Sequence, residues 1–586
     1  MKHWKFREAP LPAPNTQWAE ELHISPLLLS LLWARGHNSK AALENFLSAN
    51  LSQLAPPACW PGIPKAAELL AHRLLHGGKL AVWGDYDVDG ITATTLVLDV
   101  LECHGITALS HLPDRRCEGY GLNIPAIEAL AAAGVDTLLT VDCGISDAAP
   151  IARARELGME VILSDHHLPP ENLPDATAIC NPRLSTDDPC PCPHLAGVGV
   201  AFFLMSAVNS LLHKARGTRC KMDSVLDLVA LGTLADVMRL SGQNRLLVKG
   251  GLRWLAEARR PGMAALKKVS NFDESAVVSS GQAVFRLAPR INAAGRMGHA
   301  DLALRLLRAK KRDEAMALAE ELDTLNTERR QEEERIGKEA REEALRQVAE
   351  GRSALVLYGA DWHAGIIGIV ASRIVDEFYR PTIILCNDHD AVKGSGRSIP
   401  EFDLHAGLTR MSDMMLGFGG HRQAAGVRIA PDTLEKFREA FNAVVRGELG
   451  DAPLTPTLTL ECELNFRQAG SQVFLKELEL LQPFGPGNSE PVFASPLLKV
   501  TARLPLGRTG EHVLLRLLDE STGHTLQAKA WRQAALLPES LCGRHIRVAY
   551  TPRLDQYNGV TSVDVNIKDW KLADAATDCA ALPAEH

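Results

Sequence analysis

Three acidic residues, Asp85, Asp87 and Asp89, stand at alternate positions and are followed directly by a glycine. This spacing is typical of the start of a calcium-binding helix–loop–helix, which also needs a preceding helix and a glutamate at the twelfth loop position. Leu96 stands at that position, and the short apolar run 79–83 before the acids predicts a buried strand. The calcium loop is therefore rejected, and the acids follow a strand.

Acidic and imidazole side chains also follow two later apolar runs, 135–141 and 159–163. Helical runs at 91–101 and 148–157 separate these strands, which predicts a parallel sheet whose carboxyl ends share one edge, where open α/β sheets bind ligands. A further apolar helix, 226–233, leads to another carboxylate. The side chains that we expect together at this edge are those of Asp87, Asp89, Asp142, Asp165, His166, His167 and Asp236.

This set of side chains favours a metal site. A single acid after a strand more often caps a helix, but three successive strands that deliver acids or imidazoles to one edge are typical of metal binding. Oxygen donors with one or two imidazoles suit Mn²⁺ or Mg²⁺. Four or more carboxylates would repel one another around one ion, whereas two ions about 3.5 to 4 Å apart need that charge and a bridging carboxylate. The sequence therefore predicts two ions and phosphoryl chemistry.

The composition sets limits on the whole chain. Its 586 residues exceed the length of one core and predict several domains. We expect a cytoplasmic protein without a membrane segment, because no apolar run approaches the roughly 18 to 20 residues of a bilayer span and the start lacks a signal peptide. The 12 cysteines include no C-x-x-C pair, and the Cys190–His194 cluster is interpreted as an ordinary surface loop. The net charge of −8 argues against a general coat on nucleic acid.

The four strand and helix ends resemble the motifs of the DHH phosphoesterases. They read GDYDVDG (84–90), VDCG (141–144), SDHH (164–167) and GTLADV (232–237). Within this family the chain is most similar to the bacterial single-strand-specific DNA exonucleases, and the resemblance extends through further stretches at 112–123, 195–202, 288–298, 362–373, 393–398 and 417–426.

The resemblance implies a role for each metal ligand. It implies that Asp87 and Asp89 bind separate ions and that Asp142 bridges them, with His166 and Asp236 completing the set. Pyrophosphatases of the family have a histidine ligand where this chain has Trp83. One ion is therefore expected to be held more loosely and by more water.

The resemblance also implies a catalytic group beside the metals. His167 is expected near the scissile phosphate, while Asp85 and Asp165 are expected to support the ligands and hold them in orientation.

A second α/β lobe is predicted after a long charged helix, 313–350, which is apolar only near its ends and is interpreted as a strut between two lobes. The lobe is expected to contain a strand at 354–358, a helix at 365–378 and a strand at 382–386, and the resemblance identifies it as a DHHA1 domain that binds the substrate backbone. Its glycine-rich stretches, 393–398 and 417–423, are expected to present amides to an anion. The candidate substrate-binding residues are Arg115, Arg290, Arg296, Ser395, Arg397 and His421.

Short alternating runs between 496 and 570 predict a small antiparallel barrel of the OB type. Basic and aromatic residues on it could bind a single strand. The candidates are Arg503, Arg508, Lys529, Arg532, Arg547 and Arg553, with Trp531 and Tyr557 for base stacking.

The expected fold class is α/β, with two α/β lobes (DHH and DHHA1) joined by a long helix and a C-terminal OB-like β-barrel. The expected domains are a helical lead-in at 1–50, a DHH catalytic domain at 51–312, the connecting helix at 313–350, a DHHA1 domain at 351–450, an OB-fold domain at 451–573 and a disordered tail at 574–586.

The resemblance implies a single-stranded-DNA exonuclease of 5′-to-3′ polarity that releases 5′-mononucleotides in DNA repair and recombination. A phosphodiesterase for short oligonucleotides, cyclic dinucleotides or pyrophosphate is the alternative, although such enzymes are shorter and lack the barrel. A catalytically inactive replication scaffold is disfavoured because every ligand is present. We expect a monomer that binds single-stranded DNA, and the sequence leaves open whether a single-strand-binding protein and a helicase are partners.

Overall fold

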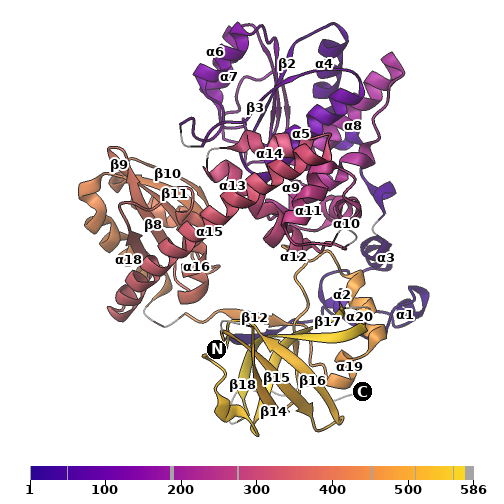
Figure 1. Ribbon diagram of the computed structural model, residues 1–586, viewed down its shortest axis with the longest axis vertical. Helices are drawn as coiled ribbons and strands as arrows, with labels where there is room; N and C mark the ends of the chain where they lie inside the picture. Colours follow the sequence, from indigo (N-terminus) through magenta and orange to yellow (C-terminus); the bar gives the residue numbers. More distant parts are fainter. Residues whose placement is uncertain are drawn as a thin grey trace. The chain divides into compact units, whose positions relative to one another are not determined.

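The computed structural model describes residues 2–48, 50–115, 117–184, 190–273, 276–297, 299–450, 452, 454–507, 510–557 and 560–573. The chain divides into two compact units (Figure 1). Unit 1 consists of residues 1–49, 455–484 and 488–586, and unit 2 of residues 50–454 and 485–487. The expectations for Arg508, for the side chain of Tyr557 and for the tail at 574–586 lie outside the described residues.

Unit 2 begins with the predicted parallel sheet, which has five strands in the order β3-β2-β4-β5-β6. Its strands β2 and β4 are buried on both faces, which explains why they read as continuous apolar runs. The strands are β2 (Leu80–Gly84), β3 (Leu109–His111), β4 (Thr137–Val141), β5 (Glu160–Ser164) and β6 (Ala178–Cys180).

Helices cover both faces of this sheet. One hydrophobic core joins one face to α4 (Ile63–Leu75), α5 (Val88–Cys103) and α8 (Gly197–Arg216). A second core joins the other face to α6 (Ile124–Ala132) and α7 (Ala148–Glu156). Since β2 alternates its side chains between the two cores, with Val82 in the first and Trp83 in the second, the sheet forms the middle layer.

Helix α8 is, among the described residues, the one helix long and apolar enough to cross a membrane, contrary to the expectation that no run reaches that length. Most of it is buried inside the unit. The segment after α8 is mainly helical. Its helices include α9 (Leu226–Ala235), α10 (Gly242–Glu257), α11 (Pro261–Val269), α13 (Ala288–Met297) and α14 (Ala300–Arg308).

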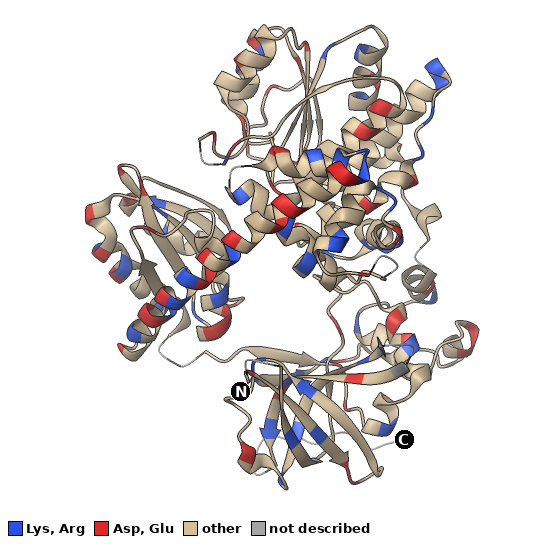
Figure 2. Ribbon diagram, viewed as in Figure 1, with Lys and Arg blue, Asp and Glu red and all other residues tan. Residues whose placement is uncertain are grey.

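The long predicted helix is α15 (Arg312–Ala349), and acidic and basic residues intersperse along it (Figure 2). It contacts α11, α13 and α14, and also α16 (Ile367–Phe378) and β7 (Leu355–Tyr358), so it joins the two α/β parts of unit 2 as expected. Its middle is not simply a solvated face. Arg329 is buried there and donates hydrogen bonds to Asn326 and Glu333, which are also buried.

The second α/β part has a five-stranded sheet in the order β10-β11-β9-β8-β7. Its remaining elements are β8 (Thr382–Asp388), β9 (Ala391–Arg397), α17 (Leu404–Thr409), β10 (Gly417–His421), β11 (Ala424–Ile429) and α18 (Leu434–Leu449).

The stretch 393–398, which is expected to present amides to an anion, lies mostly in β9, a strand inside the sheet that pairs with β11 and β8. Its glycines allow close packing: a Cβ at Gly394 would lie 2.4 Å from Leu385 Cδ2, and one at Gly396 would lie 2.8 Å from Leu404 Cδ2. The second glycine-rich stretch forms the edge strand β10. The backbone of β9 is therefore engaged in the sheet on both sides, whereas for the edge strand β10 the binding of an anion stays a prediction.

Unit 1 contains the predicted barrel. Its strands follow the order β13-β17-β14-β15-β16-β18, and β17 also pairs with β18, which closes the sheet. The strands are β13 (Phe493–Ala494), β14 (Leu498–Leu506), β15 (His512–Asp519), β16 (His524–Ala530), β17 (His545–Tyr557) and β18 (Val560–Leu572).

The N-terminal segment belongs to the barrel unit. Strand β1 (His3–Phe6) pairs in parallel with β12 (Thr457–Leu460), so the expected helical lead-in begins with a strand. The helices that follow, α1 (Gln17–Glu21), α2 (Pro26–Ala34) and α3 (Lys40–Ser48), share one core with the barrel, α19 (Phe466–Ala469) and α20 (Gln472–Leu480).

Candidate active site

The carboxyl ends of β2, β4 and β5 bring the predicted metal ligands together. Ligand atoms of Asp85, Asp87 and Asp142 lie within 4.8 Å of one another, and so do those of Asp89, His166 and Asp236, the last of which caps the C-terminus of α9. His166 Nε2 is 3.1 Å from Asp142 Oδ1. Asp142 therefore lies between the two sets.

Asp89 is fixed by the N-terminus of α8. Its Oδ2 accepts a hydrogen bond from Gly197 N–H at 2.7 Å, and its Oδ1 accepts one from Val198 N–H at 2.9 Å. The positive end of the helix dipole also favours this carboxylate. Asp87 acts as the N-cap of α5 and accepts from Gly90 N–H at 3.1 Å. Each carboxylate is thus oriented by a helix N-terminus.

Two glycines make room for the ligands. A Cβ at Gly197 would lie 2.4 Å from Asp142 Oδ1, and a Cβ at Gly232 would lie 2.8 Å from Asp89 Oδ1. Both separations are far shorter than ordinary contacts, so side chains at these positions would displace the carboxylates.

The electrostatics of the cluster suit divalent cations. Burial, followed by repulsion between the carboxylates, holds the pKa values of Asp142 and Asp236 well above the ordinary range and raises the pKa of Asp89 to about 7. Burial and nearby His167 lower the pKa of His166 to about 3, so its imidazole is neutral. Asp142 Oδ1, Asp236 Oδ2 and His166 Nε2 make no hydrogen bond within the described chain. Closely spaced buried carboxylates and a neutral imidazole are a fitting donor set for Mn²⁺ or Mg²⁺.

His167 differs from His166 in its charge. Asp165 Oδ1 accepts hydrogen bonds from the His167 ring at 2.8 Å and from the backbone N–H groups of both histidines. Burial alone would lower the pKa of His167, but the contact with Asp165 raises it to about 9. Burial would raise the pKa of Asp165, yet His167 lowers it to about 2. At neutral pH the pair is therefore an imidazolium held by a carboxylate.

Asp85 belongs to the first of the two ligand sets, with Asp87 and Asp142. Its side chain is buried, and its Oδ1 accepts from Tyr86 N–H at 2.8 Å. Burial and the charge of Asp87 raise its pKa well above the ordinary range. Trp83, which stands where some relatives have a histidine ligand, is fully buried in the core.

Several arginines converge beside the metal ligands. Burial, together with the nearby charges of Arg115, Arg329 and Arg397, lowers the pKa of Arg296 to about 10. Arg296 Nη1 donates to Gly365 O at 2.7 Å, and the Arg115 guanidinium lies over the Tyr86 ring at 5.2 Å. Guanidinium groups crowded in this way favour an anion such as phosphate.

Arg290 does not belong to this group. Its three nitrogens donate to Asp323 Oδ1, Arg286 O and Val269 O. Arg290 and Arg296 both lie on α13, but six residues at about 100° each place their side chains about 120° apart around the helix. The expectation that both contact substrate is therefore not supported for Arg290, which ties α13 to its neighbours.

Two predicted residues of the second α/β part approach the cluster. Ser395 Oγ accepts from Arg397 Nη1 at 3.1 Å and so supports that guanidinium. His421, on the edge strand β10, has a lowered pKa because of partial burial and then the charge of His167. The structure thus brings Arg115, Arg296, Ser395, Arg397 and His421 towards the metal ligands.

Comparisons with known proteins agree with this arrangement. The sequence model described as "DHH family, N-terminal domain" matches residues 79–233, "DHHA1 domain" matches 351–447 and "RecJ OB domain" matches 460–569. The chain is 35% identical over 568 residues to the single-stranded-DNA-specific exonuclease RecJ of Salmonella typhimurium (strain LT2), covering 94% of this chain and 96% of that protein. The chain belongs to the RecJ family. The resemblance to the DHH phosphoesterases is thereby confirmed.

RecJ proteins of other bacteria give the same result. The Escherichia coli (strain K12) RecJ is 35% identical over 581 residues, covering 94% of this chain and 96% of that protein. A crystal structure of RecJ from Thermus thermophilus in complex with Mn²⁺ superposes with a TM-score of 0.80 at 31% identity, covering 97% of this chain and 79% of that one. The predicted fold, with its OB-type barrel, is confirmed.

Sequence reasoning missed several residues of this RecJ site. Tyr120 lies with its hydroxyl 3.4 Å from His167 Nε2 and its ring edge towards Tyr86. The charge of Arg329, on α15, contributes to the lowered pKa of Arg296. The signals were an aromatic inside a glycine-flanked motif and an arginine in the apolar-free middle of the long helix, and neither stood out from its surroundings.

The basic residues predicted on the RecJ OB barrel are mostly engaged within it. Arg503 donates to Leu537 O, and Lys529 Nζ lies 2.8 Å from Asp564. Arg547 and Arg553 pair with Glu463 and Glu490. Trp531 is half exposed and donates from Nε1 to Asn566 Oδ1, which leaves its ring accessible. Trp531 and Arg532 therefore remain candidates for contact with a strand.

Proposed function

We propose that the protein is a metal-dependent exonuclease specific for single-stranded DNA, which digests from the 5′ end and releases 5′-mononucleotides. The observation that carries the proposal is the pair of ligand sets meeting at Asp142 beside the crowded guanidinium groups of Arg296 and Arg397. RecJ relatives that are named single-stranded-DNA-specific exonucleases match nearly the whole chain.

Two divalent ions, Mn²⁺ or Mg²⁺, are proposed as cofactors, and the Thermus RecJ structures in complex with Mn²⁺ and Mg²⁺ support this choice. The proposed ligands are Asp87, Asp89, Asp142, His166 and Asp236, with Asp142 shared. When bound, such ions supply a nucleophile from water and stabilise charge on the phosphate and the leaving group. The neutral imidazole of His166 and the hydrogen bonds that orient Asp89 support these assignments.

His167 is proposed to hold a proton beside the scissile phosphate. Its hydrogen bond with Asp165 favours the imidazolium form, which can donate a hydrogen bond to a phosphate oxygen as negative charge develops. Asp165 orients the ring through Nδ1, which leaves Nε2 to face the substrate. Asp85, buried next to Asp87, is proposed to support the ligands from behind.

Substrate positioning is assigned to five residues, Arg115, Arg296, Ser395, Arg397 and His421. Contacts to phosphate hold a strand without reading its sequence, which fits a general nuclease. The charge of Arg329 adds to the positive potential at Arg296, but its Nη atoms donate to Glu333 and Asn326, so we propose an electrostatic role for it and no direct contact with phosphate. Arg290 is reassigned to a structural role.

The remaining assignments follow from this function. We infer a cytoplasmic monomer that acts in DNA repair and recombination. Its proposed domains are a DHH catalytic domain at 51–312, a connecting helix at 313–350, a DHHA1 substrate-binding domain at 351–450 and an OB-fold domain at 451–573 that binds the strand. Single-strand-binding protein and a helicase are proposed as partners, since both act on the same strand as the nuclease.

The test is product release from long single-stranded DNA labelled at either end, in Mn²⁺, beside a matched duplex. We expect mononucleotides from the 5′ end of the single strand, little digestion of the duplex, and loss of activity by at least about 10³-fold in Asp142→Asn, since removal of a central electrostatic group costs about that much. A long strand that survives while dinucleotides are hydrolysed would favour the small-substrate alternative.

A further inference from the structure

Two cysteines far apart in the sequence meet at the end of α5 away from the metal ligands. Cys103 is the last residue of α5, and Cys220 lies in the segment between α8 and α9. Their Sγ atoms are 2.6 Å apart. A disulfide needs about 2.05 Å, so a small side-chain movement would bring the sulfurs to bonding distance.

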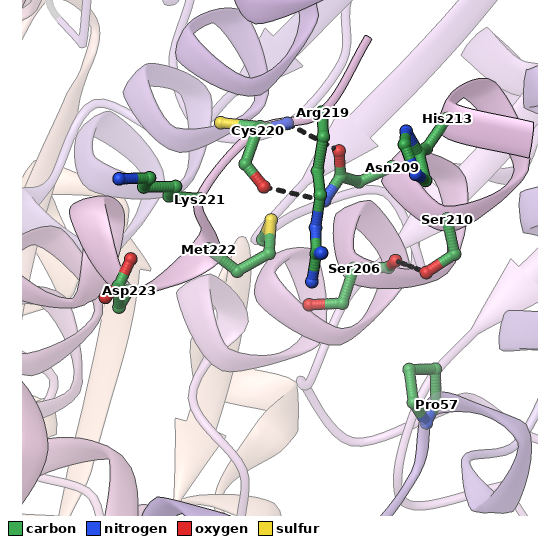
Figure 3. A pocket seen from close by; sticks show the side chains of 10 residues that line it. All are labelled: Pro57, Ser206, Asn209, Ser210, His213, Arg219, Cys220, Lys221, Met222 and Asp223. Atoms are coloured by element: carbon green, nitrogen blue, oxygen red, sulfur yellow. Dashed lines mark hydrogen bonds between the residues drawn. The ribbon is translucent and has the colours of Figure 1, made fainter. Parts of the chain in front are cut away.

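A polar network fixes the backbone around this pair. Asn209 on α8 accepts from Cys220 N–H at 2.9 Å and donates to Cys220 O at 3.0 Å (Figure 3). His104, which follows Cys103, contacts Asn209 Oδ1 through Nε2 at 2.8 Å and Thr218 Oγ1 through Nδ1 at 2.6 Å. Because Asn209 binds both the backbone of Cys220 and the side chain of His104, the residue next to Cys103, the fold itself holds the two sulfurs close together.

The two thiols have different access to solvent. Cys103 is exposed, whereas Cys220 is 3% exposed. A hollow of about 260 Å³ contains both cysteines and is lined by Asp99, Glu102 and Lys310 among others. A larger hollow of about 910 Å³ is also lined by Cys220, together with residues that include Arg219 and Lys221 (Figure 3). A small solute can therefore reach the pair.

We propose that Cys103 and Cys220 form a modification site for hydroperoxides, at which peroxide converts the thiol pair into a disulfide. The exposed Cys103 sulfur attacks the peroxide O–O bond, giving a sulfenic acid and releasing the alcohol, or water in the case of hydrogen peroxide. The Cys220 sulfur then displaces the sulfenic oxygen, which leaves as water. Two thiols lose two electrons and two protons in total, and the peroxide is the oxidant.

The roles of the two sulfurs follow from their surroundings. Burial, and then the neighbouring Cys103, raise the pKa of Cys220 to about 12, so this thiol does not react first with peroxide; it gives up its proton to the leaving hydroxide only as it attacks the sulfenic acid. The exposed residue meets the oxidant, and the buried one captures the product before further oxidation.

The disulfide would stabilise the catalytic core without contacting the proposed metal ligands. Helix α5 carries Asp89 in its first turn and Cys103 at its last residue. The whole helix has 16 residues and is about 24 Å long. The loop closed between residues 103 and 220 contains β4 and β5, and with them Asp142 and His166. Closing a loop of this length stabilises a fold mainly by restricting the unfolded chain.

The experiment treats the full-length protein with hydrogen peroxide and digests it with chymotrypsin without reduction. Peptides 102–109 and 213–222 each hold one cysteine, and cleavage after Leu, Met and aromatic residues releases both. We expect a linked peptide pair that dithiothreitol dissolves, a rise in Tm of several degrees, and nuclease activity within about twofold of the reduced protein.

Variants separate the proposal from general oxidation. In Cys103→Ser the linked pair and the rise in Tm should both be lost, whereas Cys59→Ser, another exposed cysteine, should keep both. In Cys220→Ser the sulfenic acid at Cys103 should persist and react with dimedone. The proposal is overturned if folded wild-type protein gives no linked pair in excess peroxide, or if Cys103 passes to sulfinic acid while Cys220 stays reduced.

Discussion

Replacing Gly197 with alanine should test the shared ligand without altering any ligand. In the first turn of α8, the new Cβ would lie 2.4 Å from Asp142 Oδ1, where ordinary contacts are 3.4 Å or more. The carboxylate must therefore retreat by about 1 Å, a displacement that costs on the order of 10²-fold in rate. Asp142 has little freedom to adjust, because its backbone already has a φ of 58° and its N–H donates to Ser164 O.

Gly199→Ala is the matched control two residues along the same helix. Its Cβ would meet Leu195 Cδ1 at 2.8 Å, an apolar side chain that binds no metal. Both variants add one buried methyl group, and overpacking of this kind costs about 1 to 3 kcal/mol of stability. Only Gly197→Ala displaces a ligand.

The assay combines Mn²⁺ titration by calorimetry with mononucleotide release from single-stranded DNA. For Gly197→Ala we expect Mn²⁺ affinity at least tenfold weaker and a kcat about 10²-fold lower, whereas Gly199→Ala should stay within about threefold for both. Equal losses of Mn²⁺ affinity in the two variants, or unchanged affinity and rate in folded Gly197→Ala, would refute the placement of Asp142 between the ions.

Three further results are expected. Arg296→Ala should raise the KM for single-stranded DNA by about 10- to 100-fold, because it removes a charge-assisted hydrogen bond to phosphate. Arg290→Ala should lower Tm with little change in KM. The reverse pattern in steady-state kinetics would contradict the assignment of Arg296 to substrate and of Arg290 to structure. Because the pKa of Asp89 is raised, the metal-free folded state binds a proton at this carboxylate more tightly than the unfolded chain does. The free energy of unfolding should therefore fall as the pH rises from about 4 to about 7. At about 1.36 kcal/mol per pKa unit, this group accounts for a loss of about 4 kcal/mol. Calorimetry should therefore show a larger Mn²⁺-dependent rise in Tm at pH 8 than at pH 6, and an equal rise would count against it. A fragment of residues 50–454 lacks both the N-terminal segment and the barrel. Its affinity for long single strands, measured by fluorescence anisotropy, should be at least tenfold weaker, while its rate of dinucleotide hydrolysis should change less than threefold. Parallel losses of affinity and rate would argue against a separate strand-binding unit.

Local patterns made much of the fold and of the metal cluster predictable. Asp142 and Asp165 each follow an apolar run that could only be a buried strand, and parallel topology then brings the ends of these strands to one edge. The long helix α15 was predictable because its 38 residues contain no proline and only one glycine, Gly337, which leaves few alternatives to a helix.

Features that depend on distant contacts were not predictable. In the sequence alone, the glycines of β9 are as typical of a turn as of a strand. The structure shows that Leu385 and Leu404 occupy the space that a Cβ would need at these positions. Strand β1 pairs with a strand more than 450 residues away, and no local pattern in residues 3–6 specifies that partner. Helical spacing already separates Arg290 from Arg296 around α13, so the sequence alone provided a reason to expect different roles for the two side chains.

The measurement that tests the two-metal assignment most directly is the location of Mn²⁺ by anomalous scattering from crystals of the protein. We predict two peaks about 3.5 to 4 Å apart, one in contact with Asp89, His166 and Asp236 and the other with Asp87, with Asp142 in contact with both. A single peak at saturating Mn²⁺, or two peaks that do not share Asp142, would contradict the assignment.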